Sequence, residues 1–312
     1  MADFPALRRV CLGAVLAAAL SYQHTMVAQG PAPAPTPASA MANPYTLTAK
    51  WPTLDAGMKW GASIGIIPDQ TGGTWMLFRS EPPIIHFDAA GKITKKFGDG
   101  KFVQAHGFCQ DSAGNFWAGD SGPFTDLPGA AGKGFQLFKF SPNGEVLLAL
   151  GKAGVSKAGE DTFIGPTACV VLPNGEILVA DGHWPRPTNA QQDGDRIVRL
   201  SKDGKFLASY GKMGTKPGEF MGPHALALDS QGRLFVADRS NNRIQIFDKN
   251  MQFVDEWRHF GRPSGITILK DDTMIVADSE SDQAIDGPKE SPEGAGRNKR
   301  NPLWKTGVRV GS

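Results

Sequence analysis

Two histidines at the same position of a repeated segment are the residues whose type and spacing point most directly to chemistry. His106 and His224 each stand in the first strand-like stretch of their copy of the segment. Imidazole nitrogens are common zinc ligands, and a catalytic zinc site uses three protein ligands and keeps one position open. The pair therefore indicates a zinc site, and two histidines held only by hydrogen bonds are the alternative.

A second set of polar residues recurs fifteen positions after the first. Arg239 follows His224 at this distance, and Arg79 stands at the same offset in another copy. A guanidinium can hold a carboxylate through two parallel hydrogen bonds, so both are candidate substrate-binding residues, with surface arginines as the alternative. His183 lies one position beyond this offset in a third copy and is a candidate general base or acid near neutral pH.

The repeated segment is about forty residues long and begins near residue 60. Its clearest copy, Phe220–Asp248, reads as three strands separated by turns, and Phe253–Trp257 supplies a fourth. Long spacings between some copies are explained by insertions at 122–134 and 184–194. Four-stranded units of this length are typical of β-propeller blades, with a solenoid of short strands as the alternative. Copies align at Ile64, His106, Thr167, His224 and Ser264.

In a propeller the first strand of each blade lines the central channel, so these aligned residues should form one ring. Alternating apolar positions predict the core between the blades. An aspartate recurs just before the second set of polar residues and indicates a structural turn. The expected core residues are Phe108, Trp117, Val170, Leu178, Leu226, Phe235, Val236, Ile246 and Ile275, and the recurring aspartates are Asp120, Asp181, Asp238 and Asp278.

The fifth copy has two strands at Gly265–Leu269 and Met274–Ala277 and a third at Gly307–Gly311, but no fourth. Tyr45–Trp51 would suit the outer strand of a closing blade. Because a closed ring removes exposed strand edges, we expect residues 45–312 to form an all-β, six-bladed propeller. About five blades are present in this chain, most of the sixth is missing, and the complete protein should be a monomer.

The N-terminal segment predicts export. Two arginines precede the eleven-residue apolar stretch Val10–Leu20, which is too short to span a bilayer stably, and a small residue follows at Ala28. We expect residues 1–28 to be a signal peptide and 29–44 a Pro/Ala-rich linker, which places the protein in the periplasm or outside the cell. A retained membrane anchor is the alternative.

Composition narrows the class of protein. The 312 residues include 40% hydrophobic side chains, which excludes a wholly disordered chain. The 33 basic and 31 acidic residues give a net charge of +2, so no overall field attracts nucleic acid or an anionic membrane. Cys109 and Cys169 align at positions of opposite parity in their strands, which predicts two small core residues, with neither a disulfide nor a redox role.

Several motifs resemble known families. Phe220–Phe247 resembles the NHL repeat. Phe163-Ile-Gly-Pro-Thr, Val179-Ala-Asp-Gly-His, Gly114-Asn-Phe-Trp117 and the Arg79 turn are similar to the peptidyl-α-hydroxyglycine α-amidating lyases, also called peptidylamidoglycolate lyases. This resemblance extends over about residues 60–280 and implies a propeller of NHL type.

The resemblance also implies a site. In that family three histidines from alternate blades hold zinc, and two arginines and a tyrosine serve the substrate. By resemblance His106 and His224 take zinc positions and Arg79 and Arg239 the arginine positions, while His183 stands where the family has tyrosine. The third histidine would lie in the missing sixth blade. A structural calcium ion is a further expectation.

The implied reaction cleaves a carbinolamide with a neighbouring carboxylate into an amide and an α-keto acid such as glyoxylate. Zinc would promote loss of the hydroxyl proton by lowering the pKa of a bound water. The expected partner is a small molecule or peptide that carries a carboxylate. A non-catalytic NHL module that binds protein or glycan is one alternative, and a calcium-dependent lactonase-like hydrolase is another.

Overall fold

The computed structural model describes residues 51–126, 129–281 and 306–311. The predicted signal peptide, the linker and nearly all of the predicted strand Tyr45–Trp51 lie outside these residues. Within the described ranges the regular secondary structure is almost entirely β-strand, and its one helical element is the 3-10 turn η1 (Arg239–Asn241). No helix in the described part is long and apolar enough to cross a membrane.

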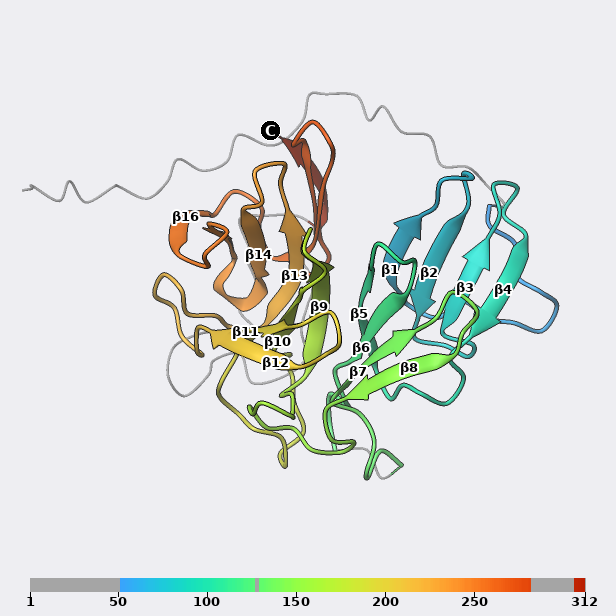
Figure 1. Ribbon diagram of the computed structural model, residues 1–312, viewed down its shortest axis with the longest axis horizontal. Coiled ribbons are helices and arrows are strands. Elements are labelled where there is room, and N and C mark those ends of the chain that lie inside the picture. Colours follow the sequence, from blue (N-terminus) through green and yellow to red (C-terminus); the bar gives the residue numbers. More distant parts are fainter. Residues whose placement is uncertain (1–50, 127–128, 282–305, 312) are drawn as a thin grey trace, which may run out of the picture. The chain divides into compact units, whose positions relative to one another are not determined.

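The strands form five antiparallel sheets, each built from consecutive strands (Figure 1). Four sheets have four strands and the last has three, as the repeat predicted. The strands of the first two sheets are β1 (Ser63–Pro68), β2 (Thr74–Phe78), β3 (Ile84–Phe87), β4 (Ile93–Phe97), β5 (Ala105–Gln110), β6 (Phe116–Asp120), β7 (Gln136–Phe140) and β8 (Val146–Leu150). Those of the other three are β9 (Pro166–Val171), β10 (Ile177–Asp181), β11 (Arg196–Leu200), β12 (Phe206–Tyr210), β13 (Pro223–Leu228), β14 (Leu234–Asp238), β15 (Arg243–Phe247), β16 (Phe253–Trp257), β17 (Pro263–Ile268), β18 (Met274–Asp278) and β19 (Gly307–Gly311).

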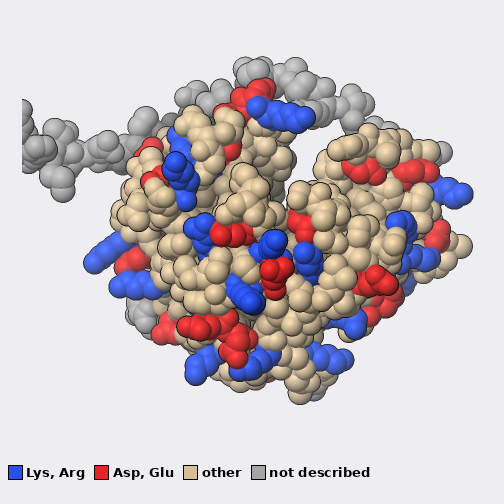
Figure 2. All heavy atoms as spheres, viewed as in Figure 1, with Lys and Arg blue, Asp and Glu red and all other residues tan. Residues whose placement is uncertain are grey.

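The first strands of successive sheets contact one another in the order β1, β5, β9, β13 and β17. This is the arrangement of propeller blades around an axis, so the prediction of a propeller is confirmed for five blades. In the view of Figure 2, basic and acidic side chains are interspersed on the surface, in keeping with the small net charge.

A β-bulge interrupts each inner strand near the position that the repeat aligns. The register shifts at Ile64, Thr167, His224 and Ser264, and at Gly107 next to His106. A bulge re-aims the neighbouring side chains and ends regular pairing. Because of the bulges, the side chains of the aligned residues need not follow the regular alternation between the two faces of the sheet.

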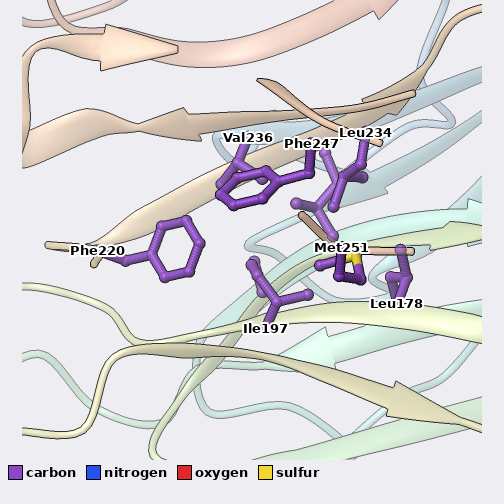
Figure 3. Close-up of a cluster of buried hydrophobic side chains, with 9 residues drawn as sticks. Leu178, Ile197, Phe220, Leu234, Val236, Phe247 and Met251 are labelled. Carbon is purple, nitrogen blue, oxygen red and sulfur yellow. The ribbon is translucent and has the colours of Figure 1, made fainter. Parts of the chain in front are cut away.

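The core lies between adjacent blades. Figure 3 shows one interface, in which Leu178 and Ile197 of the third blade pack against Phe220, Val236 and other residues of the fourth. Of the nine residues expected in the core, six are buried and three, Phe108, Val170 and Ile275, are half-buried. The strand phases read from the sequence are therefore correct.

The recurring aspartates have the structural role that their recurrence indicated. Asp120 accepts hydrogen bonds from the backbone N–H groups of Val103 and Gln104, and Asp181 accepts from those of Ile164 and Gly165. Asp238 and Asp278 accept equivalent bonds in the fourth and fifth blades. Each carboxylate ties the end of a second strand to the segment that enters the first strand of its blade.

The prediction that the cysteines do not pair is wrong. Cys109 on β5 and Cys169 on β9 form a disulfide, with their Cα atoms 5.7 Å apart. They do occupy opposite parities, but they belong to adjacent blades whose facing surfaces are opposite faces of their sheets. Opposite parity therefore directs both sulfur atoms into the same interface, where they pack with Trp117 and Val179.

Candidate metal centre

Three histidines converge from three different blades. His106 lies on β5, His183 in the turn after β10 and His224 on β13. One ring nitrogen of each lies within 4.8 Å of the corresponding atoms of the other two, and this is the one group of three or more potential metal ligands in the described ranges. The structure thus brings together the two predicted ligands and a third histidine that was expected to act as an acid or base.

Backbone carbonyls fix the tautomers of two of these histidines. The Nδ1 atom of His106 donates to the carbonyl of Thr167 at 2.6 Å, and that of His224 donates to the carbonyl of Ser264 at 2.7 Å. Because a carbonyl oxygen can only accept, these contacts require a proton on Nδ1 of both rings, and the 2.6 Å contact with Thr167 outweighs the longer 3.1 Å approach of the Gly107 N–H to the same Nδ1 of His106. Each neutral ring therefore presents an unprotonated Nε2.

The two Nε2 atoms face each other at 3.1 Å. Two lone pairs at this distance repel unless a proton or a cation lies between them. Two ligand nitrogens of a tetrahedral zinc ion, each bound at about 2.0–2.1 Å, are about 3.3 Å apart. The buried Nδ1 of His183 has no hydrogen-bond partner, although its ring lies within the same cluster. The three rings therefore suit a metal ion.

Burial keeps the imidazoles neutral. Desolvation lowers the pKa of His106 to about 3, and the positive charge of Arg79 adds to this effect. Desolvation likewise holds the pKa values of His183 and His224 well below their ordinary value, with further lowering from nearby charges that include Arg239. Neutral imidazoles at neutral pH are the form that binds metal.

Both the ring and the backbone of His183 are held by residues of neighbouring insertions. Its ring stacks on Phe124 with the planes 6° apart and the centroids 4.3 Å apart. Its backbone carbonyl accepts a hydrogen bond from Arg186 at 2.5 Å. Phe124 comes from the insertion after β6, and Arg186 from the insertion after β10. Both insertions found in the sequence therefore contribute residues that hold His183 in the site.

The two predicted arginines lie near the histidines. Arg79 places its guanidinium 4.9 Å from the ring centroid of Phe124 and donates from Nε to the carbonyl of Ala105 at 3.1 Å. Arg239 is 5% exposed and donates to the carbonyl of Trp184 at 3.2 Å. Burial lowers the pKa of each to about 10, so both stay charged at neutral pH.

The other aligned residues have structural roles. Ile64 packs in the hydrophobic interface between the first two blades. The hydroxyl of Thr167 donates to the carbonyl of Pro223 at 2.5 Å, and that of Ser264 lies 2.7 Å from the hydroxyl of Ser279. Sequence reasoning did not select Arg262 and Glu280, which lie beside Arg239. The signal for Glu280 was available, because it follows Asp278 by the same two positions by which His183 follows Asp181.

Comparisons with known proteins agree with this architecture. Residues 220–247 match the NHL repeat model. Over 182 residues the chain is 34% identical to mouse peptidyl-glycine alpha-amidating monooxygenase. The match covers 55% of this chain and 16% of the mouse protein. The chain therefore carries an NHL repeat and is similar over about half of its length to an amidating enzyme.

Two further relatives extend the comparison. Human NHL repeat-containing protein 3 is 33% identical over 203 residues, or 61% of this chain and 55% of that one. Drosophila melanogaster peptidyl-alpha-hydroxyglycine alpha-amidating lyase 1 is 32% identical over 171 residues, or 51% and 28%. The chain thus spans between 16% and 55% of the length of these relatives.

One solved structure, a gluconolactonase candidate, shares the fold. Its TM-score is 0.51 at 14% sequence identity, and the match covers 72% of this chain and 73% of that chain. At this identity the likeness concerns the fold alone.

Proposed function

We propose that this protein is a zinc-dependent lyase that acts on a carbinolamide with a neighbouring carboxylate and releases an amide and an α-keto acid. The observation that carries the proposal is the pair of unprotonated Nε2 atoms, 3.1 Å apart, beside the unpartnered Nδ1 of His183. Relatives named as α-hydroxyglycine amidating lyases support the reaction type.

In this proposal His106, His183 and His224 hold the metal. Three neutral imidazoles are a donor set typical of zinc. His183 then acts as a ligand and not as the general acid or base first expected. It supplies the third imidazole that the resemblance placed in a sixth blade. When bound, zinc would polarise the hydroxyl of the carbinolamide and make its proton easier to lose.

Arg239 and Arg79 would hold the substrate carboxylate beside the histidines. Both guanidiniums are partly or fully desolvated, so their attraction for an anion is stronger than it would be at the surface. Phe124 packs against both the His183 ring and the Arg79 guanidinium and would limit the access of water to the reacting atoms. The proposed partner is therefore a small molecule or a peptide with a terminal carboxylate.

Three further parts of the proposal concern the whole protein. The predicted signal peptide at residues 1–28 would direct the protein to the periplasm or the medium. A six-bladed, monomeric ring follows from the need to cover the edges of the first and last sheets. A structural calcium ion is a further proposal.

The experiment is an assay of amide and glyoxylate release from an N-acyl-α-hydroxyglycine by the full chain. His183→Ala should abolish turnover together with bound metal. Arg239→Gln should keep the metal and raise KM, because it removes charge pairing with the carboxylate. A zinc-loaded wild type that binds but does not cleave this substrate would favour the non-catalytic NHL module.

A further inference from the structure

Glu280 places a carboxylate among the arginines of the site. It follows Asp278 by two positions in the turn after β18, just as His183 follows Asp181 after β10. Its Oε2 atom lies 2.8 Å from Nε of Arg262 and 3.4 Å from Nη1 of Arg239. The repeat therefore directs a carboxylate of this chain to the place where a substrate carboxylate is expected.

Arg262 is a third cation of the same region. It precedes β17 and its side chain is 1% exposed, and its backbone N–H donates to the buried carboxylate of Asp278 at 3.1 Å. Its charge helps to lower the pKa of Arg239 and that of His224. Arg262 therefore lies close enough to act on both the predicted substrate arginine and the histidine cluster.

Two adjacent buried guanidiniums repel each other and need an anion. Removing the partner of a buried charge is strongly destabilising, so this pair favours any carboxylate that can reach it. Glu280 meets that need in the structure. Although burial raises its pKa, the charges of Arg239 and Arg262 outweigh this effect and hold the pKa of Glu280 below its usual value.

Glu280 differs from its partners in its access to solvent. Its side chain is 31% exposed, whereas those of Arg239 and Arg262 are 6% and 1% exposed. The carboxylate can therefore rotate into water while both guanidiniums remain in place.

We propose that Arg262 joins Arg239 and Arg79 in the carboxylate subsite and that Glu280 is its internal competitor. A ligand carboxylate would displace Glu280 and take over its pairing with Arg239 and Arg262. Arg262 would then contribute to specificity for substrates with a carboxylate next to the reacting carbon. The chemical class of the ligand rests on the proposed function, but the competition itself does not require turnover.

The test is the binding of hippurate, a non-reacting N-acylglycine, to the full chain by titration calorimetry. Glu280→Gln removes the competing charge and keeps the size of the side chain, so hippurate should bind at least about tenfold more tightly. The neutral analogue hippuramide should bind equally to both proteins. Glu176→Gln is the matched control, because Glu176 pairs with Arg199 in a different part of the chain, and it should leave hippurate binding unchanged.

A second variant examines Arg262. In the Glu280→Gln background, Arg262→Gln should reverse most of the gain for hippurate. If this double variant does not fold, the comparison of hippurate with hippuramide in Glu280→Gln alone still decides the proposal. Hippurate affinity that is unchanged within twofold or weaker in Glu280→Gln, or an equal gain for hippuramide, overturns it. Tighter hippurate binding without lyase turnover would contradict the proposed function and leave the competition intact.

Discussion

Removal of the disulfide should cost the protein several kilocalories per mole. Cys109 and Cys169 are 60 residues apart in sequence. Loop closure over this length restricts the unfolded chain by about 4 kcal/mol in the chain-entropy treatment. The link joins the second and third blades, which also carry the histidines at 106 and 183, so its loss loosens the unit that holds the site.

The perturbation is the double variant Cys109→Ala/Cys169→Ala, compared with wild type under non-reducing conditions. For a domain of this size, about 4 kcal/mol corresponds to a fall in Tm of roughly 8–16 °C. Circular dichroism measures the melting temperature, and alkylation followed by mass spectrometry of the wild type counts reactive thiols. Two alkylated thiols at these positions in unreduced protein, or a Tm lowered by less than about 2 °C, would refute the reasoning.

Two other predictions concern charge. Burial lowers the pKa of His106 to about 3 in the folded, metal-free protein, so this ring stays neutral there. In the unfolded chain the imidazole has its ordinary pKa of 6.5 and takes up a proton below that pH. The free energy of unfolding should therefore fall as pH drops below about 6.5, by up to about 1.4 kcal/mol per pH unit from this group, and a urea midpoint that is constant from pH 7 to 5 would contradict this. The Arg243 side chain is 1% exposed and pairs at 2.8 Å with the buried carboxylate of Asp238. Arg243→Met should therefore lower the free energy of unfolding, measured in urea, by about 3–5 kcal/mol, because it leaves a buried charge without its partner. A loss below about 1 kcal/mol would show that backbone donors alone stabilise the Asp238 carboxylate.

The repeat alone predicted much of this architecture. Aligning five copies gave the strands, the blade interfaces and the convergence of His106 with His224, because residues at one offset of a propeller occupy equivalent places around the axis. The same reasoning gave Arg239 its place beside the histidines. These results follow from periodicity, which is a property of the sequence.

What the sequence did not reveal depends on contacts between copies. The opposite parity of Cys109 and Cys169 follows from the alternation of their strands, but their pairing depends on adjacent blades meeting through opposite faces of their sheets. His183 was selected as a site residue, yet its place within the histidine cluster depends on the turn after β10 and on stacking against Phe124. Arg262, just before β17, and Glu280, just after β18, meet at the same end of an antiparallel strand pair, and no single motif contains both.

The measurement that tests the central claim most directly is the metal content of the full chain. The protein would be dialysed against a low concentration of zinc and its bound metal determined by mass spectrometry. We predict one zinc ion per chain in the wild type, and loss of that ion in His106→Ala, His183→Ala and His224→Ala. The exposed His259 lies outside the cluster, so His259→Ala should retain the metal. A wild type without bound metal, or a His183→Ala variant that still binds one zinc ion with unchanged affinity, would contradict the account.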